Sequence, residues 1–262
     1  FTLRGFDQRQ VGVFVDGVPA SVPYDGQLDL GKLPGDTLGQ AEVAPGGAAG
    51  VYGPGSLGGS VRIRTLAPPD HAAWALSGRA STHGATELSS WVGGPVGPVR
   101  LRVSGAARTS PGWPLPRDFE AHAREDGGLR DASDRRSGQG GLRADLPLGR
   151  GGTLCVSGRY LLGDFGVPTG LVDDRARYWR FSRFEDRALS VARRSPEDAL
   201  VRSEEVLFVA ANTNVLDAFD DATRSSQELQ GSWHSTYRDH RLGGAWTGTA
   251  DLGAVRTLGW AL

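Results

Sequence analysis

The sequence predicts a mainly β protein in two parts, a small mixed domain over residues 1–66 and a series of antiparallel strands over residues 73–262. Three observations lead to this prediction. The first part has short apolar runs separated by Gly and Pro turns. The second part repeats segments of roughly ten residues in which apolar and polar side chains alternate. Between them, residues 67–72 include Pro68-Pro69, which cannot continue a hydrogen-bonded ladder, and are expected to be a linker.

Composition excludes several other classes of protein. Hydrophobic residues make up 39% of the 262, glycine contributes 39, and no long helix-period apolar stripe is present, unlike an ordinary α/β enzyme. The net charge of -1 and the scattered arginines argue against a nucleic-acid partner. The single Cys155 cannot form an internal disulfide, and no Cys/His cluster suggests structural zinc. No apolar run approaches the roughly 18 residues of a membrane-spanning helix.

The first domain is expected to contain three strands and a glycine-rich loop. Val11–Val15 forms the first strand and ends at the turn signal Asp16-Gly17. An irregular apical stretch follows, through Val22-Pro23-Tyr24-Asp25. Ala41–Ala44 and Ser60–Thr65 alternate as two further strands on either side of the glycine-rich loop.

The second part is expected to contain about nine strands. They are predicted at about 73–82, 87–94, 99–108, 138–147, 153–163, 188–194, 205–211, 241–252 and 255–262. In one of them, Leu154, Val156, Tyr160 and Leu162 share one face, and Cys155, Ser157 and Arg159 share the other. Half-buried strands of a soluble β-sandwich show the same alternation, so this pattern alone leaves both architectures open.

The connections between these strands favour a membrane barrel. Short links, such as Leu148–Gly152, alternate with long excursions at about 109–137, 164–187 and 212–240. Outer-membrane barrels have short periplasmic turns and long extracellular loops, because each hairpin returns the chain to the same side. A sandwich has no reason to segregate loop length in this way, so the pattern predicts a transmembrane antiparallel β-barrel.

No motif supports catalysis or a bound cofactor. Gly53-Pro54-Gly55-Ser56-Leu57-Gly58 matches the dinucleotide fingerprint, but a strand-like run follows it where the fingerprint needs a helix N-terminus. No H-E-x-x-H or G-x-S-x-G is present, so we expect neither an enzyme nor a cofactor. Asp164, Asp173-Asp174 and Asp220-Asp221 could offer oxygen ligands to Ca²⁺, but their spacing fits no EF-hand, and no metal site is predicted.

Four spaced motifs resemble the plug domain of TonB-dependent outer-membrane receptors. They are Arg4-Gly5-Phe6, Asp16-Gly17-Val18-Pro19, Glu42-Val43 running into a Gly-rich turn, and Tyr52-Gly53 to Gly58-Gly59 followed by Val61–Thr65. The resemblance implies a small mixed plug domain inside a barrel of about 22 strands. Because the chain begins at Phe1 without methionine or a signal peptide, we expect a fragment of a longer precursor.

The resemblance also implies the function. It suggests a receptor in the bacterial outer membrane that imports a scarce nutrient, such as a ferric siderophore or cobalamin, without covalent chemistry. The expected partners are TonB with ExbB and ExbD, through a segment missing from this chain, together with outer-membrane lipid and a small ligand such as a metal chelate. A structural or adhesive barrel is the alternative, and a soluble β-sandwich enzyme is a weaker one.

The ligand is expected to meet aromatic side chains at the plug apex and in the outer loops, because aromatic rings supply stacking area. The candidates are Tyr24, Asp25, Trp113, Tyr178 and Trp179, with packing within the loops as the alternative role. The expected plug-motif and plug–barrel residues are Arg4, Gly5, Asp16, Gly17, Glu42, Gly46, Tyr52, Gly53, Gly58 and Gly59. Pro45-Gly46 stands where the family commonly has Arg-Gly, so Arg4 is expected to pair with barrel carboxylates.

Overall fold

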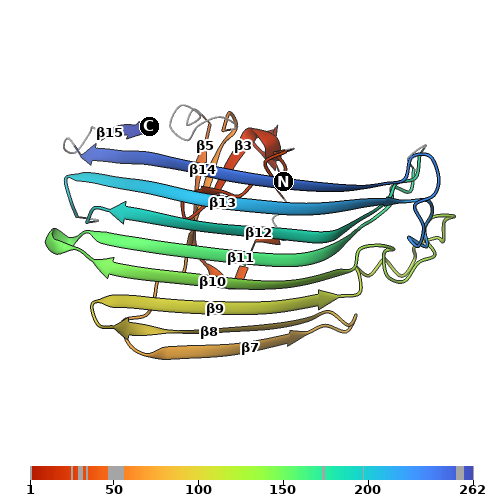
Figure 1. The fold of residues 1–262 in the computed structure, drawn as a ribbon, viewed down its shortest axis with the longest axis horizontal. Coiled ribbons are helices and arrows are strands. Elements are labelled where there is room, and N and C mark those ends of the chain that lie inside the picture. The colour runs from red at the N-terminus through yellow and green to blue at the C-terminus, as the bar shows by residue number, and fades with distance from the viewer. Residues whose placement is uncertain are drawn as a thin grey trace.

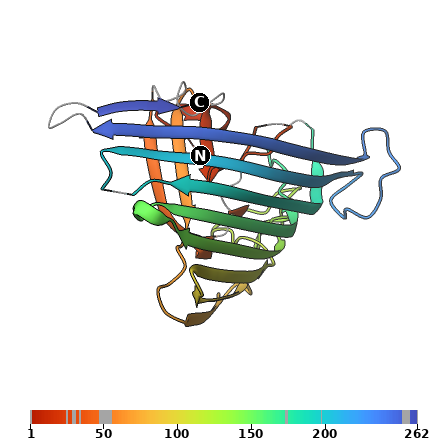
Figure 2. The same ribbon diagram turned by 60° about the vertical axis from the view of Figure 1, so that its left-hand side comes forward.

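The computed structural model describes residues 2–24, 26–28, 32–33, 35–46, 56–172, 175–196, 198–251 and 257–261. These residues form a nine-stranded antiparallel sheet and a four-stranded mixed sheet that lies against its inner face (Figures 1 and 2). We call them the barrel sheet and the plug sheet. No helix within the described residues is long and apolar enough to cross a membrane.

The plug sheet is built around a strand pair that is distant in sequence. Its order is β4-β3-β6-β5, with β3 (Val11–Val15) parallel to β6 (Gly59–Thr65) and antiparallel to β4 (Val18–Pro19). The edge strand β5 (Leu38–Pro45) pairs antiparallel with β6. Its core consists of Val11, Val13, Val15, Leu28 and Ile63.

Short elements complete this domain. The strands β1 (Thr2–Leu3) and β2 (Phe6–Asp7) form a separate hairpin. The 3-10 helix η1 (Gln8–Gln10) follows, capped by the Asp7 carboxylate, and η3 (Gly35–Thr37) precedes β5. The Ser56–Gly58 segment leads directly into strand β6, so the expectation that a strand follows the glycines is confirmed.

The barrel sheet runs in strict sequence order, as consecutive hairpins require. Its strands are β7 (Ala73–Ala80), β8 (Thr86–Val96), β9 (Val99–Ser110), β10 (Arg135–Pro147), β11 (Thr153–Val167), β12 (Tyr178–Arg194), β13 (Val201–Phe219), β14 (Trp233–Asp251) and β15 (Thr257–Ala261). The 3-10 helix η4 (Gly149–Gly151) forms the turn between β10 and β11. The mainly β architecture and the nine strands predicted from the sequence are therefore confirmed.

Several strands extend further than the alternation predicts. β12 begins at Tyr178 instead of about residue 188, and β13 continues to Phe219 instead of about residue 211. A bulge between Phe181 and Arg183 interrupts the period-two pattern of β12, which explains why the sequence hides its first half. The predicted long loops are correspondingly shorter, at 111–134, 168–177 and 220–232.

The two faces of the barrel sheet are inverted relative to a soluble protein. Large apolar side chains on the outer face are exposed, and Trp74 and Leu242 are 75% and 88% accessible. Polar side chains on the inner face are buried beneath the plug sheet, among them Arg102, Arg143 and Ser190. A face that is apolar and open suits contact with lipid. The predicted separation of Tyr160 and Leu162 from Cys155 and Ser157 is confirmed.

Loop length is segregated between the two ends of the sheet. The links at 97–98, 148–152 and 195–200 are short, whereas the longer links at 111–134, 168–177 and 220–232 all lie at the opposite end (Figure 1). We call these the turn end and the loop end. The short link at 81–85 also lies at the loop end, as parity requires.

Candidate functional site

An ionic contact joins the plug sheet to the barrel sheet near the turn end. Glu204 of β13 accepts hydrogen bonds from Arg62 and Arg64 of β6, with Arg64 Nη2 at 3.4 Å. On its other side, Glu204 Oε1 accepts from Arg194 Nε of β12 at 2.7 Å. The Glu204 side chain is only 11% exposed, so three guanidinium groups surround one desolvated carboxylate.

A second chain of polar contacts crosses the same interface. Asp16 lies at the end of β3 and accepts hydrogen bonds from Thr65, from N at 3.1 Å and from Oγ1 at 2.7 Å. The Thr65 carbonyl in turn accepts from Arg143 of β10, whose guanidinium makes a bidentate pair with Asp145 at 2.9 and 3.1 Å. This chain fixes the end of β6 to the wall, so Asp16 is both a turn residue and an anchor.

At two glycines of the predicted motifs, the backbone lies too close to a neighbouring side chain to leave room for a Cβ atom. Gly17 has φ of +80°, and a Cβ there would lie 2.7 Å from Cγ1 of Val206 on β13. A Cβ at Gly58 would lie 2.5 Å from Cβ of Phe6, which holds the β1–β2 hairpin against the start of β6. A side chain at Gly17 would therefore push the plug from the barrel wall.

An aromatic contact joins the two sheets nearer the loop end. The ammonium group of Lys32 lies over the rings of Phe165, Phe181 and Phe184, at 5.0, 4.7 and 4.0 Å from their centroids. Phe165 and Phe184 also meet edge to face at 6.0 Å. The apolar rings thus hold the only lysine of the chain by cation–π attraction.

Tyr24 extends this contact toward β13 and β14. Its ring stacks on Tyr237 with 4.3 Å between centroids, and its hydroxyl accepts a hydrogen bond from Asn214 Nδ2 at 3.1 Å. Tyr24 remains 39% exposed, whereas Asn214 is 1% exposed. The edge of the stacked rings is therefore accessible from above the plug, whereas the Tyr24 hydroxyl is bonded to a buried side chain.

A second aromatic pair lies further out on the same inner face. Trp179 of β12 meets Trp233 of β14 at 5.7 Å, about 13 Å along the strands from the level of Tyr237. Arg177 lies over Trp179 at 5.2 Å, and Arg224 over Tyr178 at 5.8 Å. Tyr178 and Trp179 begin strand β12, so their predicted placement in the loop is wrong.

Three outer loops are tied together around one buried threonine. The Thr169 carbonyl accepts from Arg130, its hydroxyl donates to Arg177 O at 2.9 Å, and Arg224 Nη2 reaches that hydroxyl at 3.4 Å. Thr169 is 4% exposed. Burial lowers the pKa of Arg224, because the junction of the three loops partly removes its guanidinium group from water.

Loop carboxylates reinforce the junction. Asp134 makes a bidentate pair with Arg180 at 3.1 and 2.8 Å, and these hydrogen bonds hold the pKa of Asp134 below its ordinary value. Asp220 accepts hydrogen bonds from the Ser232 hydroxyl and from the amides of Glu228 and Leu229, which lower its pKa. Trp113 is 57% exposed, and its amide donates to Ser133 Oγ at 2.8 Å.

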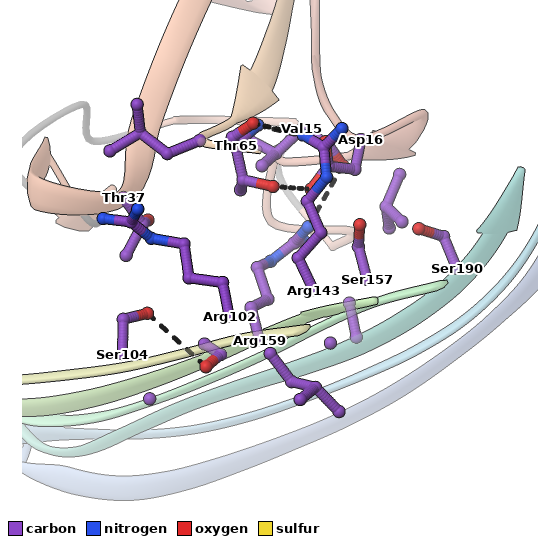
Figure 3. A pocket seen from close by; sticks show the side chains of 17 residues that line it. Val15, Asp16, Thr37, Thr65, Arg102, Ser104, Arg143, Ser157, Arg159 and Ser190 are labelled. Atoms are coloured by element: carbon purple, nitrogen blue, oxygen red, sulfur yellow. Dashed lines mark hydrogen bonds between the residues drawn. The ribbon is translucent and has the colours of Figure 1, made fainter. Parts of the chain in front are cut away.

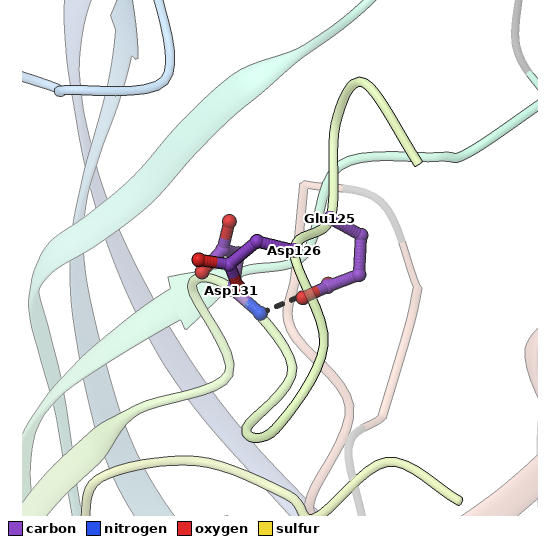
Figure 4. Close-up of side chains that lie close together, drawn as sticks. All are labelled: Glu125, Asp126 and Asp131. Atoms are coloured by element: carbon purple, nitrogen blue, oxygen red, sulfur yellow. Dashed lines mark hydrogen bonds between the residues drawn. The ribbon is translucent and has the colours of Figure 1, made fainter. Parts of the chain in front are cut away.

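Glu125, Asp126 and Asp131 bring carboxylate oxygens within 4.8 Å of one another (Figure 4). One Glu125 oxygen already binds Arg130 and the Asp131 amide, the latter at 3.0 Å. Burial, with the charges of Glu125 and Asp126, raises the pKa of Asp131. Glu125 is 2% exposed, and its hydrogen bonds to Arg130 and Asp131 anchor this part of the loop.

The other predicted residues take different places. Arg4 and Gly5, with φ of +51° and +84°, form the tight turn between β1 and β2. Within the described ranges no carboxylate pairs with Arg4, and Arg62 and Arg64 supply the ion pairs to the wall instead. Gly46 directly follows β5 with φ of +67°, and exposed Glu42 lies opposite Arg62 in the register. Asp25, Tyr52 and Gly53 lie outside the described residues.

Sequence reasoning missed the partners of the predicted residues. Glu204 lies 142 residues from Arg62, and Asn214 lies 190 from Tyr24, so no local pattern links them. One signal was available. Arg62 and Arg64 alternate with apolar residues along β6, and Lys32 is the only lysine, which are unusual features for a domain enclosed by protein.

Comparison with known proteins identifies the first domain. The family model of the TonB-dependent receptor plug domain matches residues 1–60. The vitamin B12 transporter BtuB of Vibrio vulnificus (strain YJ016) is 36% identical over 64 residues, which cover 24% of this chain and 10% of that protein.

Solved structures share the fold of nearly the whole chain. The FrpB iron transporter from Neisseria meningitidis aligns with a TM-score of 0.72 at 15% identity, covering 96% of this chain and 40% of that one. A mutant ferric enterobactin receptor, PfeA of Pseudomonas aeruginosa, gives 0.67 at 18% identity, with 98% and 41% covered. The copper transporter OprC gives 0.66 at 15% identity, with 95% and 37% covered. The chain spans about two fifths of the length of these structures.

The fold and the interface define a class of protein in which a plug domain is seated against the polar inner face of an antiparallel barrel sheet. The family match identifies residues 1–60 as a TonB-dependent receptor plug domain, and the chain as a whole shares the fold of the solved transporters.

Proposed function

We propose that this chain forms the plug and the first barrel strands of an outer-membrane transporter that imports a scarce nutrient with energy from TonB. The proposed division places the plug at 1–66, the linker at 67–72 and barrel strands from residue 73 onward. The observation that carries the proposal is a plug-family domain held against a sheet whose opposite face is apolar and exposed. In this proposal TonB acts with ExbB and ExbD, and the chain performs no covalent chemistry.

The proposed ligand surface is the inner face between the plug and the loop junction. It contains the Tyr24–Tyr237 stack and, nearer the loops, the Trp179–Trp233 pair, with Trp113 in the 111–134 loop. Aromatic faces and arginines at one site suit a bulky, planar or anionic ligand. Candidate cargoes are a ferric siderophore, cobalamin or copper, matching what the similar transporters are named for.

Uptake by the full-length receptor tests this proposal. The receptor would be expressed in cells that lack their own siderophore and cobalamin receptors, with and without TonB. We expect uptake of one cargo among ferric enterobactin, cyanocobalamin and copper, and loss of that uptake without TonB. Uptake that persists without TonB, or failure of every metal chelate and corrinoid to bind, would contradict the proposal.

The alternatives predict different behaviour. A structural or adhesive barrel would locate to the outer membrane but would transport none of these cargoes in either strain. A soluble β-sandwich enzyme would not have an exposed apolar face that includes Trp74, Leu207 and Leu242, at 75%, 70% and 88% accessibility. That inverted surface favours a membrane barrel over the soluble enzyme, and the plug-domain match favours the transporter over a structural barrel.

A further inference from the structure

Arginines on the two faces of the barrel sheet have different surroundings. On the inner face, Arg143 and Arg159 point from the barrel wall toward the plug (Figure 3). Each has a carboxylate partner at 2.9 Å, on Asp145 and Asp186 respectively. The charge of these inner arginines is therefore balanced within the protein.

A group of basic side chains lies on the outer face, in the half of the sheet nearer the loop end. Arg183 and Arg187 belong to β12, and their side chains are 55% and 57% exposed. Arg238 and His240 belong to β14 and are also exposed. We call these four residues the outer basic patch.

The strand register places the members of the patch on the two sides of β13. Ala211 of β13 lies between Arg187 and His240, and Thr213 lies opposite Arg238. Neighbouring strands are about 4.8 Å apart, so β12 and β14 are separated by about 10 Å. Ala211 and Thr213 have short side chains, so the long side chains of Arg187 and Arg238 can reach over β13 to one ligand.

The patch carries a net positive charge. Glu185 is 7% exposed and pairs with Arg183 at 2.6 Å and with Arg187 at 3.8 Å. Among the residues that the structure describes, no carboxylate pairs with Arg238. One carboxylate thus balances three guanidinium groups, and the excess charge is positive even when His240 is neutral.

The outer face next to the patch, on its side toward the turn end, is apolar. The adjoining register row consists of Leu189, Val209 and Leu242, all of which are exposed. A molecule that matches both surfaces has an anionic head and an apolar tail. Guanidinium groups bind phosphate oxygens through strong charge-assisted hydrogen bonds, and acyl chains would cover the apolar row.

We propose that the outer basic patch binds the phosphate of an anionic lipid head group. Arg187 and Arg238 contact the phosphate from opposite sides of β13, and the acyl chains lie along Leu189, Val209 and Leu242. This inference rests on the proposed membrane barrel. It does not depend on the cargo or on TonB, because the patch lies on the face opposite to the plug and the ligand surface.

Lipid binding to the purified full-length receptor tests this proposal. The receptor, in micelles of an uncharged detergent, would be titrated with dioleoyl phosphatidic acid or with dioleoylglycerol, which has the same acyl chains and no phosphate. Native mass spectrometry would count the bound lipid. An arginine near anionic head groups contributes about 1 kcal/mol, or about fivefold in affinity. We expect Arg187→Gln and Arg238→Gln each to lower the affinity for phosphatidic acid by about that factor and to leave dioleoylglycerol binding unchanged.

Arg193→Gln is the matched control. Arg193 lies on the same face of β12, further toward the turn end, and its side chain is 59% exposed. Its replacement should leave the affinity for phosphatidic acid nearly unchanged, and Arg238→Lys should retain most of that affinity. Equal losses in Arg187→Gln and Arg193→Gln would overturn the proposal. Displacement of the lipid by millimolar inorganic phosphate would also overturn it, because the site would then recognise phosphate without the lipid.

The lipid test and the uptake test have separate outcomes. A receptor that takes up its cargo but shows no preference for phosphatidic acid over dioleoylglycerol would overturn the lipid site alone. A preference that is lost in Arg187→Gln, in a receptor that transports no cargo, would support the lipid site and contradict the proposed function.

Discussion

The contacts between the plug domain and the barrel sheet differ in chemistry between the turn end and the loop end. Near the turn end, Glu204 forms an ionic contact with arginines of both sheets, and its side chain is 11% exposed. Nearer the loop end, Lys32 and Tyr24 lie against aromatic rings, and Tyr24 remains 39% exposed. The first contact depends on one carboxylate that three guanidinium groups share, and the second depends on ring area that a ligand could also reach. The strength of the plug contact and its sensitivity to ligand are therefore properties of different residues.

The largest effect is expected from Glu204→Gln. This change removes the carboxylate charge from beside Arg62 and Arg194, whose side chains are 21% and 16% exposed, and removing one partner of a largely buried pair costs about 3–5 kcal/mol. We expect a loss of this order in the free energy of plug unfolding, measured by hydrogen exchange of the β6 amides in the full-length receptor.

The neighbouring residue is the matched control for that change. Glu205 pairs with Arg193 on the outer face, where the side chains are 37% and 59% exposed. Exposed pairs contribute about 0–1 kcal/mol, so Glu205→Gln should leave β6 exchange nearly unchanged. Equal effects of the two substitutions would remove the distinction between the ionic contact and an ordinary surface pair.

A smaller effect is expected from Lys32→Gln, which removes the cation from above Phe165, Phe181 and Phe184. A desolvated cation–π contact contributes about 1–2 kcal/mol. The free energy of plug unfolding should fall by about that amount, and Lys32→Arg should restore most of it. If the free energy of plug unfolding is no higher in Lys32→Arg than in Lys32→Gln, the alkyl stem of Lys32, and not its charge, makes the contact.

Tyr24 separates ring stacking from hydrogen bonding. Tyr24→Phe keeps the stack on Tyr237 and loses the hydrogen bond from Asn214, a change of about 0.5–1.5 kcal/mol. Tyr24→Ala removes both contacts. We expect cargo affinity of the full-length receptor, measured by titration calorimetry, to fall with Ala and to stay within a few-fold of the parent protein with Phe. Unchanged affinity in the Ala variant would exclude Tyr24 from the ligand surface.

The smallest effect concerns pH and the loop junction. The pKa of Asp134 is lowered from its ordinary 3.8 by hydrogen bonds from Arg180, so its contribution to stability is present above that value. It is lost as pH falls through the lowered pKa. Exchange of the 111–134 loop amides should be steady, after correction for intrinsic rates, from pH 7 to pH 5 and should rise below pH 4. Asp134→Asn should weaken this acid dependence, and an identical profile in the variant would assign it to other groups.

Sequence patterns predicted the fold better than they predicted the interface. Period-two alternation located the middle of each barrel strand, because one face is apolar and the other polar there. It failed at the loop ends, where Tyr178 to Arg187 carry polar side chains on both faces and a bulge changes the register. The glycine motifs indicated tight turns, and Gly17 and Gly58 confirm that close approach requires them.

The interface residues could not be paired from the sequence. Glu204, Arg62 and Arg194 come from three strands, and only the seating of one sheet on the other brings them together. Because Pro45 stands where the family commonly has arginine, the sequence favoured Arg4 as the residue that pairs with barrel carboxylates. In the structure, Arg62 and Arg64 of β6 form the ion pairs with the barrel sheet. Local motifs specify backbone shape, and partners across an interface depend on tertiary contacts that a single sequence does not display.

The parallel pairing of β3 and β6 has a mechanical consequence. The five register pairs from Val11–Gly59 to Val15–Ile63 join a strand that follows the N-terminal hairpin to a strand whose end is anchored to the wall through Thr65. A force that pulls the start of β3 away from the anchored end of β6 is directed along both strands. Their hydrogen bonds then carry the load in shear, all at once, and not one after another as in unzipping. The N-terminal hairpin, which is outside this sheet, should yield before the plug core does.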